Sequence, residues 1–151
     1  MHIATKSSKF DISKESRTAQ LAKKFAKLLK TGDVVFLFGE IGAGKTTFVK
    51  YLINFLENKK KKRLSEITSP TFSILNEYKV KNLKIRHYDL FRLEKKSDAL
   101  NVGIFENTDE YITLVEWPEK VSKNFKKKYN IHFQFNFSKN ERYVKINKEN
   151  K

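Results

Sequence analysis

The sequence of 151 residues contains no cysteine, only two prolines and five glycines, and about half as many acidic residues (17) as basic ones (32). The absence of cysteine excludes disulfides, thiolate metal sites and a cysteine nucleophile. No apolar stretch approaches the ~18 residues that a membrane-spanning helix needs, and the N-terminus lacks the apolar centre of a signal peptide. We therefore expect a soluble, cytoplasmic protein with no membrane segment.

What the chain does contain is material for a core. Apolar residues make up 39%, and 13 Phe and 6 Tyr are among the aromatic residues. A chain of this length can bury about two-thirds of its unfolded surface. We find no internal repeat and no linker, and so predict one domain over residues 1–151.

Three of the five glycines fall within one short segment. Residues 39–46 read Gly-Glu-Ile-Gly-Ala-Gly-Lys-Thr, which fits the phosphate-binding pattern G-x-x-x-x-G-K-[ST]. Glycines let the backbone curl so that successive N–H groups point at one phosphate. Lys45 can reach the outer phosphates as a point charge, and the Thr46 hydroxyl can bind Mg²⁺. We expect the nucleotide to contact Glu40, Ile41, Gly42, Ala43, Gly44, Lys45, Thr46 and Thr47.

The segments on either side of this loop have the pattern that a phosphate site requires. Residues 34–38 form an unbroken apolar run, typical of a strand buried on both faces of a parallel sheet. After the loop, apolar residues have the spacing of one helix face, and the helix should end near Glu57. Its expected inward residues are Phe48, Val49, Tyr51, Leu52, Phe55 and Leu56. The alternative is a glycine-rich turn that carries Lys-Thr by chance, and these flanks disfavour it.

The remaining patterns predict an α/β fold. Ser13 is placed to cap a helix that runs to about residue 30, and Gly32 is a suitable left-handed residue after it. Residues 72–80 and 83–89 are expected to form a hairpin with Asn82 in its turn, and 112–115 a short strand. Alternation over 131–137 and a return strand over 142–146 predict a C-terminal antiparallel hairpin. We predict a single P-loop domain with a mixed, mostly parallel sheet flanked by helices.

Two acidic residues follow predicted strands, where open α/β sheets bind their ligands. Asp89 ends the strand over 83–89, and Glu116 follows the strand over 112–115. A P-loop enzyme needs a carboxylate near its metal and a group that positions water, so both are candidates. Acidic residues at strand ends are also often merely solvated. We interpret His87 as a packing or strand histidine.

Thr71 lies in a loop between the P-loop helix and the next strand, where a nucleotide-sensing switch threonine would lie. From the residues alone, an ordinary turn threonine after Pro70 is the preferred interpretation.

The net charge of +15 has two interpretations that we weigh equally. A lysine-rich surface can simply be solvated, or it can lie near a polyanion such as RNA. The densest cluster comprises Lys59, Lys60, Lys61, Lys62 and Arg63, and a second comprises Lys126, Lys127 and Lys128.

Four segments in register resemble one family. They are residues 39–48 (the loop), 69–78, 87–93 (His-Tyr-Asp-Leu-Phe-Arg-Leu) and 114–119 (Leu-Val-Glu-Trp-Pro-Glu). Together they resemble the small bacterial P-loop ATPase of tRNA threonylcarbamoyladenosine synthesis, TsaE or YjeE. Phe91 stands where Tyr is usual. The resemblance extends from about Thr18 to Lys120.

The resemblance implies ATP hydrolysis, with ATP and Mg²⁺, in support of TsaD- and TsaB-type subunits that modify the adenosine beside the anticodon. It implies that Asp89 and Glu116 divide metal positioning and water activation, without saying which does which. It also makes Thr71 a switch residue, places Trp117 at the nucleotide, and matches Thr18 to a threonine near the nucleotide. Because the sequence shows no arginine finger of its own near the motifs, with Arg92 as the only nearby basic candidate for that role, we expect slow hydrolysis by the isolated protein.

Other classes of nucleotide-binding protein fit less well. A guanine-specific GTPase needs an N-K-x-D motif, which the sequence lacks. A small P-loop kinase usually brings arginines over the phosphoryl group on a lid, and the five scattered arginines form no such motif. A nucleotide-gated binding module with little turnover differs from the ATPase only in rate, and stays open.

Overall fold

The computed structural model describes residues 9–57, 74–80, 82–95, 98, 103, 106–121 and 127–150. These residues form two compact units. The first unit holds the described residues of Met1–Leu29, Gly39–Thr68 and Ile131–Asn147. The second holds those of Lys30–Phe38, Ser69–Asn130 and Lys148–Lys151. The single domain over residues 1–151 stays a prediction.

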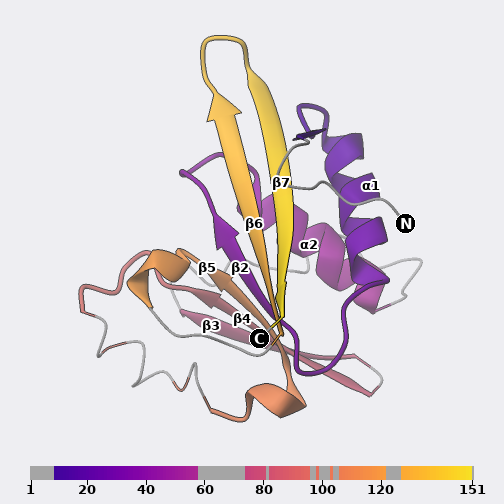
Figure 1. Ribbon diagram of the computed structural model, residues 1–151, viewed down its shortest axis with the longest axis vertical. Helices are drawn as coiled ribbons and strands as arrows, with labels where there is room; N and C mark the ends of the chain where they lie inside the picture. Colours follow the sequence, from indigo (N-terminus) through magenta and orange to yellow (C-terminus); the bar gives the residue numbers. More distant parts are fainter. Residues whose placement is uncertain are drawn as a thin grey trace. The chain divides into compact units, whose positions relative to one another are not determined.

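The first unit combines two helices with a hairpin. Helices α1 (Glu15–Ala26) and α2 (Lys45–Leu56) pack together, and the rings of Phe25 and Phe48 lie 5.9 Å apart between their centroids. Strands β6 (Lys127–Asn136) and β7 (Glu141–Asn150) are neighbours joined by a short turn (Figure 1). The two-residue strand β1 (Phe10–Asp11) pairs antiparallel with β7. Phe48 also contacts Phe133 of β6, with 5.6 Å between ring centroids, so helix and hairpin share one core.

The second unit contains a four-stranded arrangement in the order β2-β5-β4-β3. Its strands are β2 (Val34–Phe38), β3 (Leu75–Val80), β4 (Leu83–Asp89) and β5 (Ile112–Glu116). Strand β5 lies between β2 and β4 and is parallel to both, whereas β3 and β4 form an antiparallel hairpin. The 3₁₀ turns η2 (Thr108–Glu110) and η3 (Pro118–Lys120) flank β5. Because β2, β5 and β4 are parallel, their carboxyl ends meet at one edge.

One face of this arrangement carries an apolar cluster. Its buried members are Val34, Phe36, Tyr88, Leu90, Leu93, Val115 and Val121. They come from the first three residues of β2, from the next-to-last residues of β4 and β5, and from the segments that follow β4 and η3. The packing therefore holds the carboxyl ends of β4 and β5 in a fixed arrangement.

Most predicted elements are confirmed. The α/β class, the strand over 34–38, the helix after the loop, the hairpin of β3 and β4, and the C-terminal hairpin are all present. Gly32 has the expected left-handed backbone, with φ of 96°. Among the described residues, neither helix has the length and apolar character needed to cross a bilayer.

The predicted cap at Ser13 is wrong. Helix α1 begins at Glu15, its N-cap residue is Lys14, and no side chain caps it. The Ser13 hydroxyl instead accepts a hydrogen bond from the backbone N–H of Arg142 in β7, at 3.0 Å. A long-range partner thus replaces the local capping bond that the sequence pattern predicts.

The predicted inward face of the loop helix also needs correction. Ile53 is fully buried, whereas Phe55 is 36% exposed. Tyr51 and Leu56 are half-buried. Both Phe55 and Ile53 are apolar, so the pattern alone could not place the boundary of the buried face between them.

Candidate functional site

The phosphate-loop sequence connects β2 to α2 and belongs to the first unit. Its three glycines all have positive φ: 149° at Gly39, 84° at Gly42 and 111° at Gly44. Residues with a Cβ rarely adopt these conformations, so the loop needs glycine at all three positions. Gly44 is the residue from which α2 begins.

Gly39 also lies too close to β6 for any side chain. A Cβ at this position would stand 2.9 Å from the Cβ of Phe133 and 3.0 Å from its carbonyl oxygen. At Gly42 the same added atom would meet only a ring carbon of Phe135, at 4.0 Å. The first glycine of the motif is thus fixed by packing as well as by its backbone conformation.

We expect Gly39→Ala to lower the free energy of unfolding by about 2–4 kcal/mol, because overpacking adds to the strain of a positive φ. Gly42→Ala is the matched control, since it has a positive φ but room for the methyl group. Urea unfolding of the two variants measures the difference. Equal losses would mean that the contact with Phe133 contributes nothing.

Lys45 is the first residue of α2, and its side chain is buried. Its ammonium group donates a hydrogen bond to the carbonyl oxygen of Gly39 and lies 3.4 Å from that of Glu40. The first backbone N–H groups of any helix lack partners within the helix, and here they belong to the residues that follow Gly44. The ammonium group of Lys45 and the N–H groups at the start of α2 both attract negative charge, so this arrangement suits a phosphate group.

The remaining loop residues differ in exposure. Glu40, Ile41 and Gly42 are exposed, Ala43 is buried, and Thr46 and Thr47 are half-buried. Thr18 is buried in α1. These residues all belong to the first unit.

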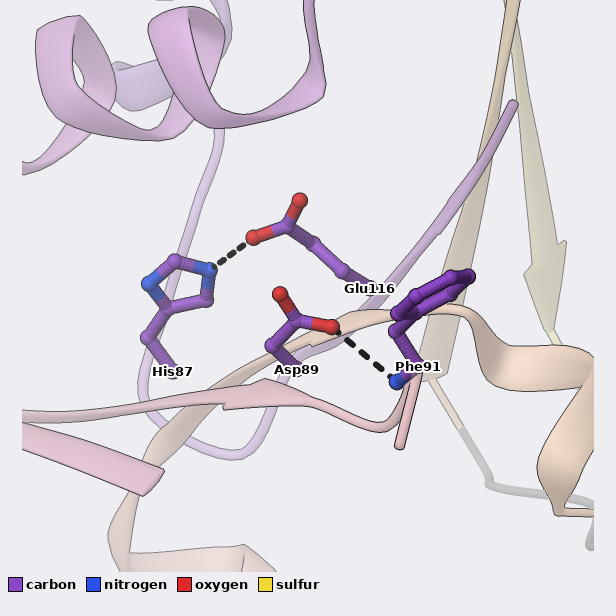
Figure 2. A network of polar contacts seen from close by, with 4 residues as sticks. All are labelled: His87, Asp89, Phe91 and Glu116. Atoms are coloured by element: carbon purple, nitrogen blue, oxygen red, sulfur yellow. Dashed lines mark hydrogen bonds and ion pairs between the residues drawn. The ribbon is translucent and has the colours of Figure 1, made fainter. Parts of the chain in front are cut away.

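The two predicted carboxylates are brought together in the second unit. Asp89 and Glu116 end β4 and β5 and are direct neighbours in the parallel register. Both are buried. The backbone N–H of Phe91 donates to Oδ1 of Asp89 at 3.1 Å, and the N–H of Leu90 donates to the backbone carbonyl of Glu116 at 3.1 Å. The bond from Leu90 joins the two strand ends, and Figure 2 shows the bond from Phe91 to Asp89.

Sequence reasoning missed the partner of Glu116. The Nε2 atom of His87 lies 2.7 Å from Oε2 of Glu116, and both side chains are almost fully buried, at 1% and 2% exposed. Figure 2 shows the imidazole turned toward this carboxylate. An ionised carboxylate only accepts hydrogen bonds, so Nε2 is then the donor. Within the described residues, His87 Nδ1 has no hydrogen-bond partner.

The signal for this contact was present in the strand pattern. His87 and Asp89 are two residues apart in β4, so their side chains share a face of the sheet. A parallel strand that ends in Glu116 then brings its carboxylate near both. Between them, Tyr88 points to the other face, where burial raises the pKa of its hydroxyl above the ordinary value.

Trp117 follows Glu116 with an unusual backbone. Its φ of 60° is left-handed, and Pro118 then begins the turn η3. The indole lies 5.0 Å from the ring of Phe91 between centroids, and Phe91 is 44% exposed. The ring of Trp117 therefore has a defined neighbour next to the carboxylates.

The carboxylate oxygens of Asp89 and Glu116 are ligands of the kind that Mg²⁺ prefers. No group of three or more His, Cys, Asp or Glu side chains within the described residues could hold a metal ion by itself. The donor set therefore fits a cation that takes its other ligands from water and phosphate, as Mg²⁺ usually does.

Other predicted residues lie elsewhere. Thr71 and the basic run 59–63 lie outside the described residues. Arg92 is exposed in the turn that follows Asp89. It is not the only arginine near a motif, because Arg142 of β7 donates from Nε to the carbonyl of Gly42 at 3.0 Å. The sequence offered no local signal for a contact over this separation.

Comparison with known proteins adds an independent observation. The profile of the family described as threonylcarbamoyl adenosine biosynthesis protein TsaE matches residues 12–145. The TsaE protein of Rickettsia conorii is 39% identical over 110 residues, which are 72% of this chain and 59% of that protein. The TsaE protein of Aquifex aeolicus is 42% identical over 106 residues, 70% of this chain and 73% of that protein. The chain thus spans about three fifths of the rickettsial relative.

A solved structure agrees. The crystal structure of YdiB from Bacillus subtilis superposes with a TM-score of 0.66 and 28% identity, over 95% of this chain and 86% of that one. The family profile covers nearly all the described residues, including the phosphate loop, the paired carboxylates, strand β6 and the first half of β7. The chain therefore belongs to the TsaE family.

Proposed function

We propose that this protein is the ATP-hydrolysing component of the machinery that makes threonylcarbamoyladenosine in tRNA. The observation that carries the proposal is the phosphate loop, in which three glycines have positive φ and the ammonium group of Lys45 donates to the carbonyl of Gly39. The names of its relatives supply the pathway, because the curated relatives are tRNA threonylcarbamoyladenosine biosynthesis proteins.

Each residue has a role that its chemistry supports. The loop backbone over residues 40–47 and the ammonium of Lys45 bind the phosphates of ATP. The Thr46 hydroxyl and the carboxylates of Asp89 and Glu116 would hold Mg²⁺, which neutralises charge on the transferred phosphoryl group when bound. One of the two carboxylates orients the attacking water. Thr71 acts as the switch residue that senses the nucleotide.

The partners follow from the same proposal. We propose that TsaD- and TsaB-type subunits stimulate hydrolysis in the cytoplasm, and that the lysine clusters lie near the tRNA. The net charge of +15 supports proximity to a polyanion.

Hydrolysis by the isolated protein should be slow and should accelerate by ~10³ or more with the partner subunits, if they supply transition-state charge in trans. Steady-state phosphate release with and without the TsaD- and TsaB-type subunits tests this. A typical kinase rate for the isolated protein, unchanged by the partners, would contradict the proposal. Loss of the modified adenosine from cellular tRNA on depletion, measured by mass spectrometry, tests the pathway separately.

A nucleotide-gated binding module with little turnover remains the second candidate. The burial of both carboxylates and the hydrogen bond from His87 to Glu116 favour the enzyme, because a simple gate needs no oriented base. Single-turnover hydrolysis within the complete complex separates the two.

Trp117 should report nucleotide binding through its fluorescence, since it is the only tryptophan. Its ring contacts Phe91 and its backbone is joined directly to Glu116. We expect ATP with Mg²⁺ to change its emission intensity or wavelength. Phe91→Leu is a useful companion variant, because it removes the ring contact and should alter the spectrum before nucleotide is added. An emission spectrum that does not change at saturating ATP would mean that the carboxyl end of β5 is remote from the nucleotide.

A further inference from the structure

Arg142 contacts the phosphate loop from 100 residues away in the sequence. It lies in β7, within the first unit, and its Nε–H donates to the carbonyl of Gly42 at 3.0 Å. Its guanidinium lies over the ring of Phe135, with 4.0 Å from the central carbon to the ring centroid. Arginine commonly stacks on an aromatic ring in this way, and the planar group then loses little further freedom when it forms a hydrogen bond.

The backbone of Arg142 is fixed as well. Its N–H donates to the Ser13 hydroxyl at 3.0 Å, and its carbonyl accepts from the N–H of Ile12 at 2.9 Å. Its Cδ atom lies 4.0 Å from the position that a Cβ on Gly44 would occupy. The aliphatic part of the Arg142 side chain therefore lies along the loop. The backbone hydrogen bonds of Arg142 and the ring of Phe135 together fix the direction of its guanidinium group.

These contacts fix one peptide group of the loop from both sides. The carbonyl of Gly42 accepts from Arg142, and the N–H of the same peptide, on Ala43, donates to the carbonyl of Glu40 at 3.1 Å. A peptide group is planar, so two bonds in opposite directions determine its orientation. Without them, glycine at position 42 would leave the loop many conformations.

We infer that Arg142 is a positioning residue, which holds the phosphate loop in its binding conformation before the nucleotide arrives. The inference rests on the proposed function and deepens it, because it assigns the C-terminal hairpin a part in the nucleotide site. The ligand concerned is the polyphosphate end of a nucleotide. Ordering a loop in advance removes that ordering penalty from binding, and so increases affinity.

The test compares ATP affinity among variants of the full chain by titration. Arg142→Ala should weaken binding about tenfold, the value of one hydrogen bond to a charged group. Arg142→Lys keeps the charge but lacks the planar Nε donor, and should remain several-fold weaker than the wild type. Phe135→Leu removes the stacking surface and should weaken binding about two- to fivefold. Lys139→Ala, an exposed residue in the turn of the same hairpin, removes one charge and should have no effect.

The rate of amide hydrogen exchange, measured without nucleotide, provides a second test, because loss of the arginine charge alone would not change this rate. In Arg142→Ala, the Ala43 amide and its loop should exchange faster, while the amides of α1 keep their rates. Should Arg142→Ala fail to fold, Phe135→Leu carries the same comparison.

The outcomes separate the inference from the proposed function. If the wild-type protein does not bind ATP, the proposed function fails. If the wild type binds ATP and either Arg142→Ala binds equally well or Arg142→Lys fully restores affinity, the positioning role is wrong. Unchanged exchange of the loop in Arg142→Ala would overturn it as well.

Discussion

Replacing Lys45 with alanine is expected to weaken ATP binding at least tenfold while the protein stays folded. Loss of one charge-assisted contact costs about 1.5–3 kcal/mol, which corresponds to this factor or more. The side chain is buried, but the contacts of its ammonium group are with the loop carbonyls of Gly39 and Glu40. Alanine is also the best helix former at the first position of α2, so the helix should persist.

The measurement is an ATP titration of wild type and variant, with thermal unfolding of each to show equal stability. Lys50→Ala is the matched control, because it removes the same charge from the same helix. The control should bind ATP like the wild type. Unchanged affinity in Lys45→Ala would remove the phosphate-binding assignment.

Replacing Glu116 with glutamine should slow hydrolysis by about 10²–10³-fold and leave ATP binding almost intact. A positioned acid or base typically contributes rate enhancement of this order, and it acts on the transition state more than on the ground state. Glutamine is a sharper choice than alanine because its side-chain oxygen can still accept the hydrogen bond from His87. Alanine would leave His87 buried without that partner, which costs about 1–3 kcal/mol of stability.

Single-turnover hydrolysis at saturating ATP, in the presence of the partner subunits, measures this effect. Asp89→Asn provides the comparison, because Asp89 is the register neighbour of Glu116. The carboxylate whose loss abolishes the Mg²⁺ dependence is the metal ligand, and the other orients water. A Glu116→Gln protein that hydrolyses ATP at the wild-type rate would leave Asp89 as the sole catalytic carboxylate.

The sequence predicted those features that a short segment determines by itself. The apolar run over β2, the glycines of the loop and the periodicity of α2 are each readable within a few residues. Asp89 and Glu116 could be predicted to lie at the carboxyl ends of strands, where open α/β sheets bind their ligands. The register pairs them directly.

The features that escaped prediction depend on segments far apart in the chain. Ser13 has the identity of a helix cap, but its hydroxyl bonds to Arg142 instead. Arg142 has no motif around it, and its closeness to the loop is seen only in the folded chain, where it donates to the carbonyl of Gly42. His87 resembles any strand histidine until the register of β4 and β5 is known. Local propensity is a weak prior, which long-range packing overrides at these positions.

The backbone of Trp117 shows how the pressures on this site can oppose one another. A bulky residue with φ of 60° carries strain of about 1–3 kcal/mol that glycine would relieve. The same side chain packs against the buried apolar cluster of the second unit and against the ring of Phe91, so glycine at position 117 would relieve the strain but lose this packing. The stability effect of Trp117→Gly is therefore the difference between two terms of opposite sign, the relief of backbone strain and the loss of packing. An unfolding free energy that Trp117→Gly leaves almost unchanged would mean that these two terms cancel, and not that the residue makes no contacts.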